Sequence, residues 1–174
     1  MDQKKVLLVV ASKGFQPREY NTPKNILEDY GYLVLTASND PTVAIAKDGS
    51  QTSVDTTLDE VRVADYDAIF FIGGPGAIEH LDNEKSYRIL REIRQAGKPF
   101  GAICIATRIL AKAGVIEGVK VTGWDGDDKL GAILQEYGAI YQPGGAIVDQ
   151  NVVTAIGPDS AEAFAEAIRG VLNR

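Results

Sequence analysis

Apolar residues occur along the chain in short unbroken runs. The clearest are residues 5–11 (KVLLVVA), 32–37 (YLVLTA), 68–72 (AIFFI) and 98–104 (KPFGAIC). Continuous runs of this kind are typical of strands that are buried on both faces of a parallel sheet. We therefore expect these four segments to lie in a central sheet.

Amphipathic stretches separate these runs and predict helices. The strongest is residues 83–97 (NEKSYRILREIRQAG), where Tyr87, Leu90 and Ile93 share one face and Gly97 follows the last turn. Another is predicted to begin at Pro23, with Thr22 as its N-cap. Three more are expected at residues 105–114 (IATRILAKAG), 128–138 (DKLGAILQEYG) and 158–172 (PDSAEAFAEAIRGVL).

Three segments complete the pattern. Residues 38–63 suggest short strands and turns, with a helical turn after Asp55 as one alternative, and residues 119–124 (VKVTGW) suggest a strand. Residues 146–156 (AIVDQNVVTAI) suggest a hairpin or strand pair. Strands and helices alternate without an internal repeat or linker, which predicts an α/β layered fold with a mostly parallel sheet. A single domain over residues 1–174 is expected.

Composition narrows the function classes. Hydrophobic residues make up 45% and charged residues 24% of the 174-residue chain, as in ordinary globular proteins. A net charge of −6 argues against a phosphate-binding surface, so nucleic acid is not a predicted partner. No stretch approaches the roughly 18 apolar residues of a membrane span. The single cysteine cannot form an internal disulfide, which favours a reducing, cytoplasmic location.

That cysteine, Cys104, stands where a predicted strand ends and a predicted helix begins. This is the arrangement of a nucleophile elbow, in which a sharp turn lifts one side chain above the sheet. Unpaired N–H groups and the positive dipole end of a helix would lower the thiol pKa and favour the thiolate. The alternative is a small buried residue, which is the commonest fate of a free cysteine.

Two further loops follow strands at the same predicted edge of the sheet. In GGPG (residues 73–76), one backbone N–H could join the N–H of Ile105 in an oxyanion hole, although a tight turn without a ligand is the alternative. Glu19 lies in the other loop, which follows the first predicted strand. If burial raised its pKa, its protonated carboxyl group could hydrogen-bond a cysteine thiolate; otherwise it is a solvated loop glutamate.

Metal and cofactor chemistry is not predicted. His80 is the only histidine, and one histidine with one cysteine does not support a zinc site. A Cys–His dyad would have to use His80, which lies beyond the glycine-rich turn. Residues 125–128 (DGDD) lack the spacing of a calcium loop, and acidic residues at a helix start explain them better.

Three motifs together resemble the ThiJ/PfpI superfamily (DJ-one/PfpI-like): residues 15–20 (FQPREY), 71–77 (FIGGPGA) and 101–124 (GAICIATRILAKAGVIEGVKVTGW). The resemblance covers essentially the whole chain. It implies a flavodoxin-like three-layer sandwich, usually a homodimer. It further implies that Cys104 is reactive and that Glu19 is its protonated hydrogen-bonding partner.

The same resemblance implies that the backbone amides of Gly74 and Ile105 are the oxyanion-hole donors. Ile105 stands where protease members carry a histidine, which argues against peptidase activity. Trp124 stands where other members carry a pocket histidine, so the base would be Glu19 or absent. Ile156 stands where members often carry an arginine, which weakens the case for anionic substrates.

The leading hypothesis is an enzyme without a cofactor that acts on small reactive carbonyls such as methylglyoxal, glyoxalase- or deglycase-like. Trp124, Tyr20 and Gly73 would line its pocket. The alternative is an oxidative-stress sensor, in which peroxide oxidises the cysteine to sulfinic acid. A glutamine amidotransferase-like site ranks low because Ala106 replaces the expected glycine. A relative with an inactive site is the remaining possibility.

Overall fold

The computed structural model describes residues 3–174 of the protein. A seven-stranded sheet of order β11-β12-β8-β7-β1-β3-β6 forms its centre. Its strands are β1 (Lys5–Val10), β3 (Leu33–Ser38), β6 (Thr56–Thr57), β7 (Ala68–Phe71), β8 (Phe100–Ile103), β11 (Ala146–Asp149) and β12 (Val152–Ala155). Every neighbouring pair is parallel except the β11–β12 hairpin, so the predicted mostly parallel sheet is confirmed.

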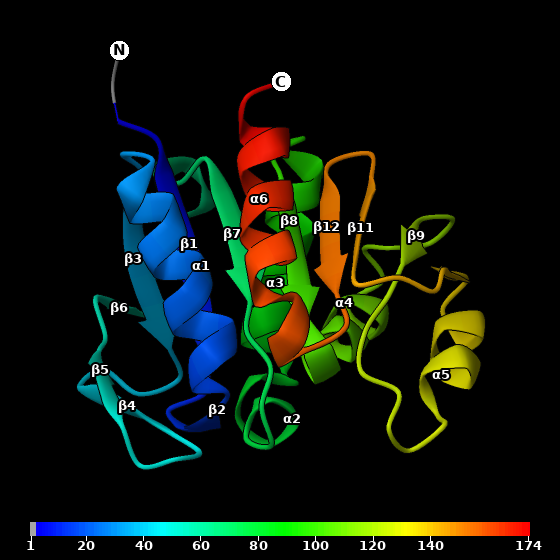
Figure 1. Ribbon diagram of the computed structural model, residues 1–174, viewed down its shortest axis with the longest axis horizontal. Helices are drawn as coiled ribbons and strands as arrows, with labels where there is room; N and C mark the ends of the chain where they lie inside the picture. Colours follow the sequence, from blue (N-terminus) through cyan, green and yellow to red (C-terminus); the bar gives the residue numbers. More distant parts are fainter. Residues whose placement is uncertain (1–2) are drawn as a thin grey trace.

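Helices cover both faces of this sheet. They are α1 (Pro17–Asp29), α2 (Ala77–Leu81), α3 (Glu84–Gln95), α4 (Thr107–Lys112), α5 (Leu130–Glu136) and α6 (Ala161–Leu172), with short 3-10 turns η1 (Val63–Asp65), η2 (Cys104–Ala106) and η3 (Pro158–Ser160). In Figure 1, α1 and α6 lie side by side on one face, while α3 and α4 lie on the other. The result is a three-layer α/β sandwich.

Strand β1 explains why two layers of helices are needed. Its side chains alternate between the two cores: Val6, Leu8 and Val10 pack in the core under α1 and α6, whereas Leu7 and Val9 pack in the core under α3 and α4. All five are fully buried. An apolar run with no polar face must be covered on both sides, as the sequence pattern predicted.

Two small sheets lie outside the central one: β2 (Lys13–Phe15), β4 (Val43–Ala46) and β5 (Gln51–Ser53) form one, and β9 (Lys120–Val121) and β10 (Ile140–Tyr141) the other. The strand expected at residues 119–124 is therefore reduced to two residues and lies outside the main sheet. After Thr122 the chain bends toward the elbow, and the Trp124 N–H donates to the Cys104 carbonyl at 3.1 Å.

Helix α1 begins six residues before the expected start. Pro17 takes the first helical position, the Gln16 side chain caps the turn, and Pro23 lies inside the helix. Either proline suits a helix start, because each has a fixed φ. Burial of the first-turn side chains of Glu19 and Tyr20 favours the earlier one. Glu19 is thus held on a helix rather than in a loop.

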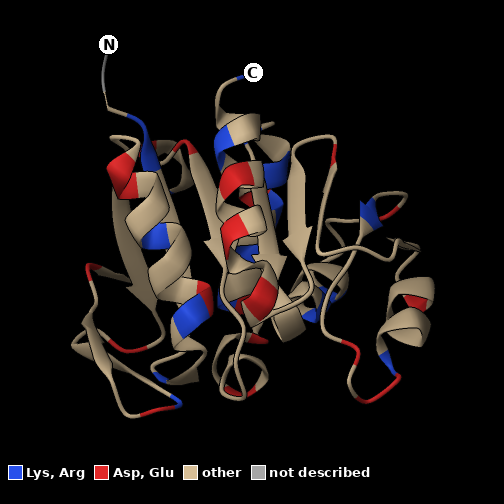
Figure 2. Ribbon diagram, in the orientation of Figure 1, with Lys and Arg blue, Asp and Glu red and all other residues tan. Residues whose placement is uncertain are grey.

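The surface carries charges of both signs. Figure 2 shows acidic and basic residues interspersed along α1 and α6. None of the helices in residues 3–174 is long and apolar enough to cross a bilayer.

Candidate active site at the carboxyl edge of the sheet

Cys104 follows β8 directly and has a φ of 64°, in the left-handed region that non-glycine residues rarely adopt. The strand-to-helix elbow predicted from sequence is therefore confirmed. Gly73 allows the close packing around it, because a Cβ there would lie 2.6 Å from both the Cys104 Cβ and Glu19 Oε2. A larger residue at this position would push the cysteine and the glutamate apart.

Glu19 is fully buried beside the elbow. Its Oε2 accepts the backbone N–H of Gly73 at 3.0 Å, and the carboxyl group hydrogen-bonds the Cys104 thiol. Loss of hydration raises the pKa of Glu19 to about 7, although these two hydrogen bonds and the positive charge of Lys47 oppose the shift. The raised pKa expected for this residue is confirmed, and burial is its main cause.

The thiol shows the opposite of the expected shift. Burial and the neighbouring Glu19 carboxylate raise the pKa of Cys104 to about 12, while the backbone N–H groups of Ile105 and Gly74, which point at the sulfur, lower it. The prediction of a lowered thiol pKa is therefore wrong. Two amides cannot offset both a dry site and an adjacent negative charge. Near neutral pH the pair consists of a protonated thiol beside a titrating carboxyl group.

A cavity of about 390 Å³ opens over this pair. Its lining residues come from the start of α1, the glycine-rich turn, the elbow, the β4–β5 turn and the segments that follow β9 and β12: Gln16, Glu19, Lys47, Gly74, Pro75, Cys104, Ile105, Trp124 and Pro158. Five predicted site residues thus meet around one space. Four lining residues were missed. Gln16 and Pro75 stand inside quoted motifs but were given no role, whereas Lys47 and Pro158 reach the cavity only through the fold.

Two predicted pocket residues do not line the cavity. Tyr20 is buried in the core, where its hydroxyl group lies 2.6 Å from Thr36 Oγ1 and 3.0 Å from Thr52 Oγ1. The prediction of Tyr20 as a pocket residue is therefore corrected: on α1 it points into the layer between helix and sheet. Gly73 is buried behind the site and acts through its N–H on Glu19.

His80 lies on α2 outside this cavity. Its Nε2 is 3.9 Å from Glu79 Oε2, and the two residues line a separate hollow with Lys13. Among the residues that line the Cys104 cavity there is no imidazole. Glu19 is therefore the group there that can exchange a proton near pH 7.

The acidic segment 125–128 forms the turn before α5, whose first turn holds no acidic residue, so the expectation that these residues lie at the helix start is wrong. Asp125 Oδ1 accepts the backbone N–H of Leu130 at 2.7 Å, and Asp127 pairs with Arg108 at 2.6 Å. Within residues 3–174, no group of histidine, cysteine, aspartate and glutamate side chains is arranged to hold a metal ion.

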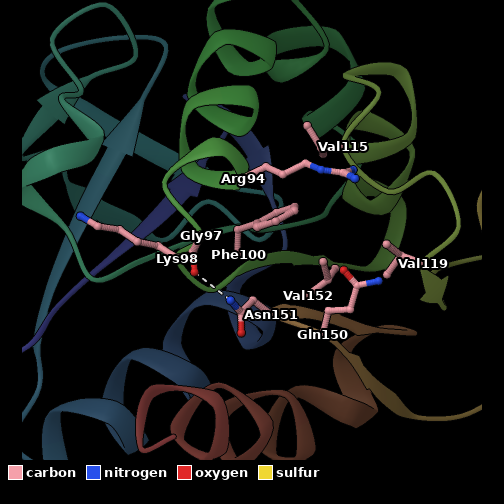
Figure 3. Close-up of a pocket in the computed structure, with 9 residues that line it drawn as sticks. All are labelled: Arg94, Gly97, Lys98, Phe100, Val115, Val119, Gln150, Asn151 and Val152. Atoms are coloured by element: carbon pink, nitrogen blue, oxygen red, sulfur yellow. Dashed lines mark hydrogen bonds between the residues drawn. The ribbon is translucent and has the colours of Figure 1, made fainter.

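A second cavity, of about 200 Å³, lies at the opposite edge of the sheet, where β8 and β12 begin (Figure 3). Two of its polar side chains are occupied by hydrogen bonds to backbone carbonyls. The Lys98 ammonium donates to the carbonyls of Val63 and Tyr66, and Asn151 Nδ2 donates to the Gly97 carbonyl at 2.8 Å. It offers no nucleophile, and the carboxyl edge remains the candidate active site.

An α/β sandwich with a partly buried cysteine at a nucleophile elbow defines the class of this protein. The DJ-1/PfpI family model matches residues 4–169, so the chain belongs to that family. The deglycase PfpI of Pyrococcus furiosus is 32% identical over 160 residues, which cover 91% of this chain and 93% of the relative. The uncharacterized protein MJ0967 of Methanocaldococcus jannaschii is 34% identical over 165 residues, covering 94% and 80%.

Solved structures agree with this family assignment. A ThiJ/PfpI domain protein from Brachyspira murdochii superposes with a TM-score of 0.92 at 30% identity, covering 99% of this chain and 98% of the other. Oxidized DJ-1 from Toxoplasma gondii superposes with a TM-score of 0.83 at 26% identity, covering 97% and 90%. The predicted superfamily membership and fold are both confirmed.

The buried carboxyl group predicts a pH-dependent stability. Because the pKa of Glu19 is raised from 4.5 to about 7 by folding, its contribution is fully present below pH 4.5 and is lost as pH rises through 7. Glu19→Gln removes this loss. The free energy of unfolding of the variant, taken relative to that of the wild type, is therefore expected to be about 3 kcal/mol higher at pH 9 than at pH 4.5.

Urea unfolding of wild type and variant at both pH values measures this difference. The comparison between the two proteins cancels the titrating groups that do not interact with Glu19; Cys104, whose pKa Glu19 raises, is not cancelled. If the difference in free energy of unfolding between the two proteins is the same at both pH values, the carboxyl group titrates normally.

Proposed function

We propose that the protein is a cysteine-dependent enzyme that converts small reactive carbonyls such as methylglyoxal, in a glyoxalase-like or deglycase-like reaction. The observation that carries the proposal is the Cys104 thiol hydrogen-bonded to Glu19 beneath an open cavity, with two backbone N–H groups pointing at the sulfur. Relatives named as deglycases support it.

The first step uses Glu19 as a general base. Its carboxylate takes the S–H proton as the Cys104 sulfur attacks the aldehyde carbon, and the carbonyl electron pair moves to oxygen. The N–H groups of Gly74 and Ile105 stabilise this developing oxyanion. Proton return from Glu19 to the oxygen gives a neutral hemithioacetal. A thiol of high pKa can react by this route, because deprotonation accompanies attack.

The second step completes an internal redox exchange. The Glu19 carboxylate removes the proton from the former aldehyde carbon, and the electron pair forms an enediolate with the adjacent ketone. The hydroxyl proton of the first carbon passes to the ketone oxygen, and Glu19 returns its proton to the second carbon. One carbon is oxidised to a thioester and its neighbour is reduced to an alcohol. Water then hydrolyses the thioester to a 2-hydroxy acid and restores the thiol. A deglycase-like reaction uses the same steps once the carbonyl leaves its amine adduct.

The raised thiol pKa ranks this enzyme above the oxidation sensor. Peroxide reacts with the thiolate, and a Cys104 pKa of about 12 keeps the thiolate scarce near pH 7. An enzyme tolerates this scarcity, because Glu19 removes the proton only when a substrate is attacked. A homodimer and a cytoplasmic location remain predictions from sequence.

The pH profile of methylglyoxal consumption tests the proposal. Because Glu19 acts in its ionised form, kcat/KM is expected to rise with pH to a plateau above its pKa of about 7. Below that pKa it should fall roughly tenfold per pH unit. The assay follows loss of methylglyoxal and appearance of lactate. Protein that consumes the substrate no faster than buffer across pH 5–9 would sink the proposal.

A further inference from the structure

The cavity over Cys104 is larger and more apolar than methylglyoxal requires. At about 390 Å³ it falls in the size range of pockets that bind drug-sized ligands. Its larger apolar wall residues are Pro75, Ile105, Trp124 and Pro158, and its polar side chains apart from the reacting pair are Gln16 and Lys47. A substrate whose only substituent is one methyl group would leave most of these walls in contact with water.

The largest of these walls, Trp124, is held firmly in place. Its backbone N–H donates to the Cys104 carbonyl at 3.1 Å, which ties the tryptophan to the elbow. The Arg108 guanidinium carbon lies 5.4 Å from the indole centroid, and one of its N–H groups donates to the Trp124 carbonyl at 3.3 Å. Contacts at both backbone and ring restrict the rotation of this side chain.

The residues behind the indole are themselves fixed. The Arg108 side chain is only 9% exposed, and its guanidinium binds both oxygens of Asp127, at 2.6 and 3.1 Å. A Cβ on Gly126 would lie 2.6 Å from the indole Cζ2, so a glycine is required for the loop to pack against the ring. Trp124 nevertheless remains 37% exposed and lines the cavity.

A rigid, half-exposed indole beside a reactive group is suited to a flat apolar partner. Aromatic rings gain from offset or edge-to-face packing beyond the area that they bury, and a fixed ring loses little entropy when it binds. Lys47, from the β4–β5 turn, is the only cation among the lining residues, and its charge acts on Glu19 in the reacting pair.

We propose that Trp124, clamped by Arg108 and Gly126, is the specificity-determining wall of this site and selects carbonyl substrates that carry an aryl group over methylglyoxal. The inference rests on the proposed function and names its substrate class. An aryl α-oxoaldehyde places its aldehyde carbon at the Cys104 sulfur and its ring against the indole. Arg108 is a positioning residue, because it acts on the substrate through Trp124.

Initial rates with phenylglyoxal and methylglyoxal test the selectivity. The wild type is expected to favour phenylglyoxal in kcat/KM by roughly tenfold or more. Trp124→Ala should lose most of this preference, whereas Trp124→Phe should keep it. Arg108→Lys, which retains the charge but not the planar clamp, should fall between them. Equal preference in wild type and Trp124→Ala would overturn the proposal.

Binding without turnover separates this inference from the proposed function. Trp124 is the only tryptophan, so the indole N–H gives a single side-chain signal in an ¹⁵N NMR spectrum. In Cys104→Ser, acetophenone is expected to shift this signal saturably, whereas acetone does not. If the wild type shows no turnover but Cys104→Ser still binds acetophenone, the proposed function is contradicted and the aryl site is supported. Turnover of methylglyoxal without acetophenone binding overturns the aryl site alone.

A linear ketone tests whether the site prefers a flat ring to an alkyl chain. The probe 2-octanone has the same number of carbons as acetophenone but no ring. Acetophenone is expected to bind several-fold more tightly. Equal affinity for the two ketones would show that the wall recognises apolar area in general and would overturn the aryl preference.

Discussion

Replacing Cys104 with serine is expected to lower kcat/KM for methylglyoxal by roughly a thousandfold or more. A serine hydroxyl is a much weaker nucleophile than a thiol, and no hemithioacetal can form. Cys104 is the only cysteine of the chain, so no second thiol can take its place. The measurement is lactate formation at pH 8, where the Glu19 base is ionised in most molecules.

The matched control for this substitution is His80→Gln. It removes the only histidine of the chain, which lies on α2 outside the Cys104 cavity. We expect His80→Gln to retain the wild-type rate. A Cys104→Ser variant that turns over as fast as His80→Gln would show that the elbow cysteine is not the nucleophile.

Glu19→Gln is expected to lower kcat/KM by roughly a hundredfold or more, because the amide cannot accept the thiol proton. Glutamine has nearly the same shape, and its carbonyl oxygen can still accept the Gly73 N–H that Glu19 accepts at 3.0 Å. The rise in rate through pH 7 should disappear together with the carboxyl group. Steady-state rates between pH 5 and 9 measure both effects.

Glu79→Gln supplies the control, because it makes the same chemical change at an exposed carboxylate outside the cavity. Its rate and pH profile should match the wild type. The stability expected of Glu19→Gln at high pH sharpens the comparison: a variant that is more stable yet inactive has lost a proton acceptor rather than its fold. A Glu19→Gln variant with the wild-type pH profile would assign the base to another group.

Much of this architecture could be predicted from local patterns. The apolar run of β1 predicted a strand covered on both faces, and the packing of Leu7 and Leu8 into opposite cores bears this out. The position of Cys104 at a strand-to-helix junction predicted its elbow. Both inferences depend on residues adjacent in sequence, whose backbone geometry and side-chain direction follow from periodicity.

Errors arose where two local solutions were equally good. Pro17 and Pro23 each suit the first turn of a helix, and only the packing of α1 against the sheet favours the earlier start. The same shift turns Tyr20 into the core, where its hydroxyl group meets Thr36 and Thr52 instead of the cavity. A helix face is defined by its neighbours, and these lie on β3 and β5, distant in sequence.

The sequence by itself determined the α/β class, the family and the pairing of one cysteine with one candidate carboxyl group, because these follow from periodicity and motifs. Only the tertiary structure decided the protonation of that pair. The pKa of Glu19 and of Cys104 depends on how completely α1, β7 and β8 exclude water from them. The clamp on Trp124 likewise requires α4 and the loop before α5 to meet. Solvation and contact are properties of the assembled chain, so no local pattern contains them.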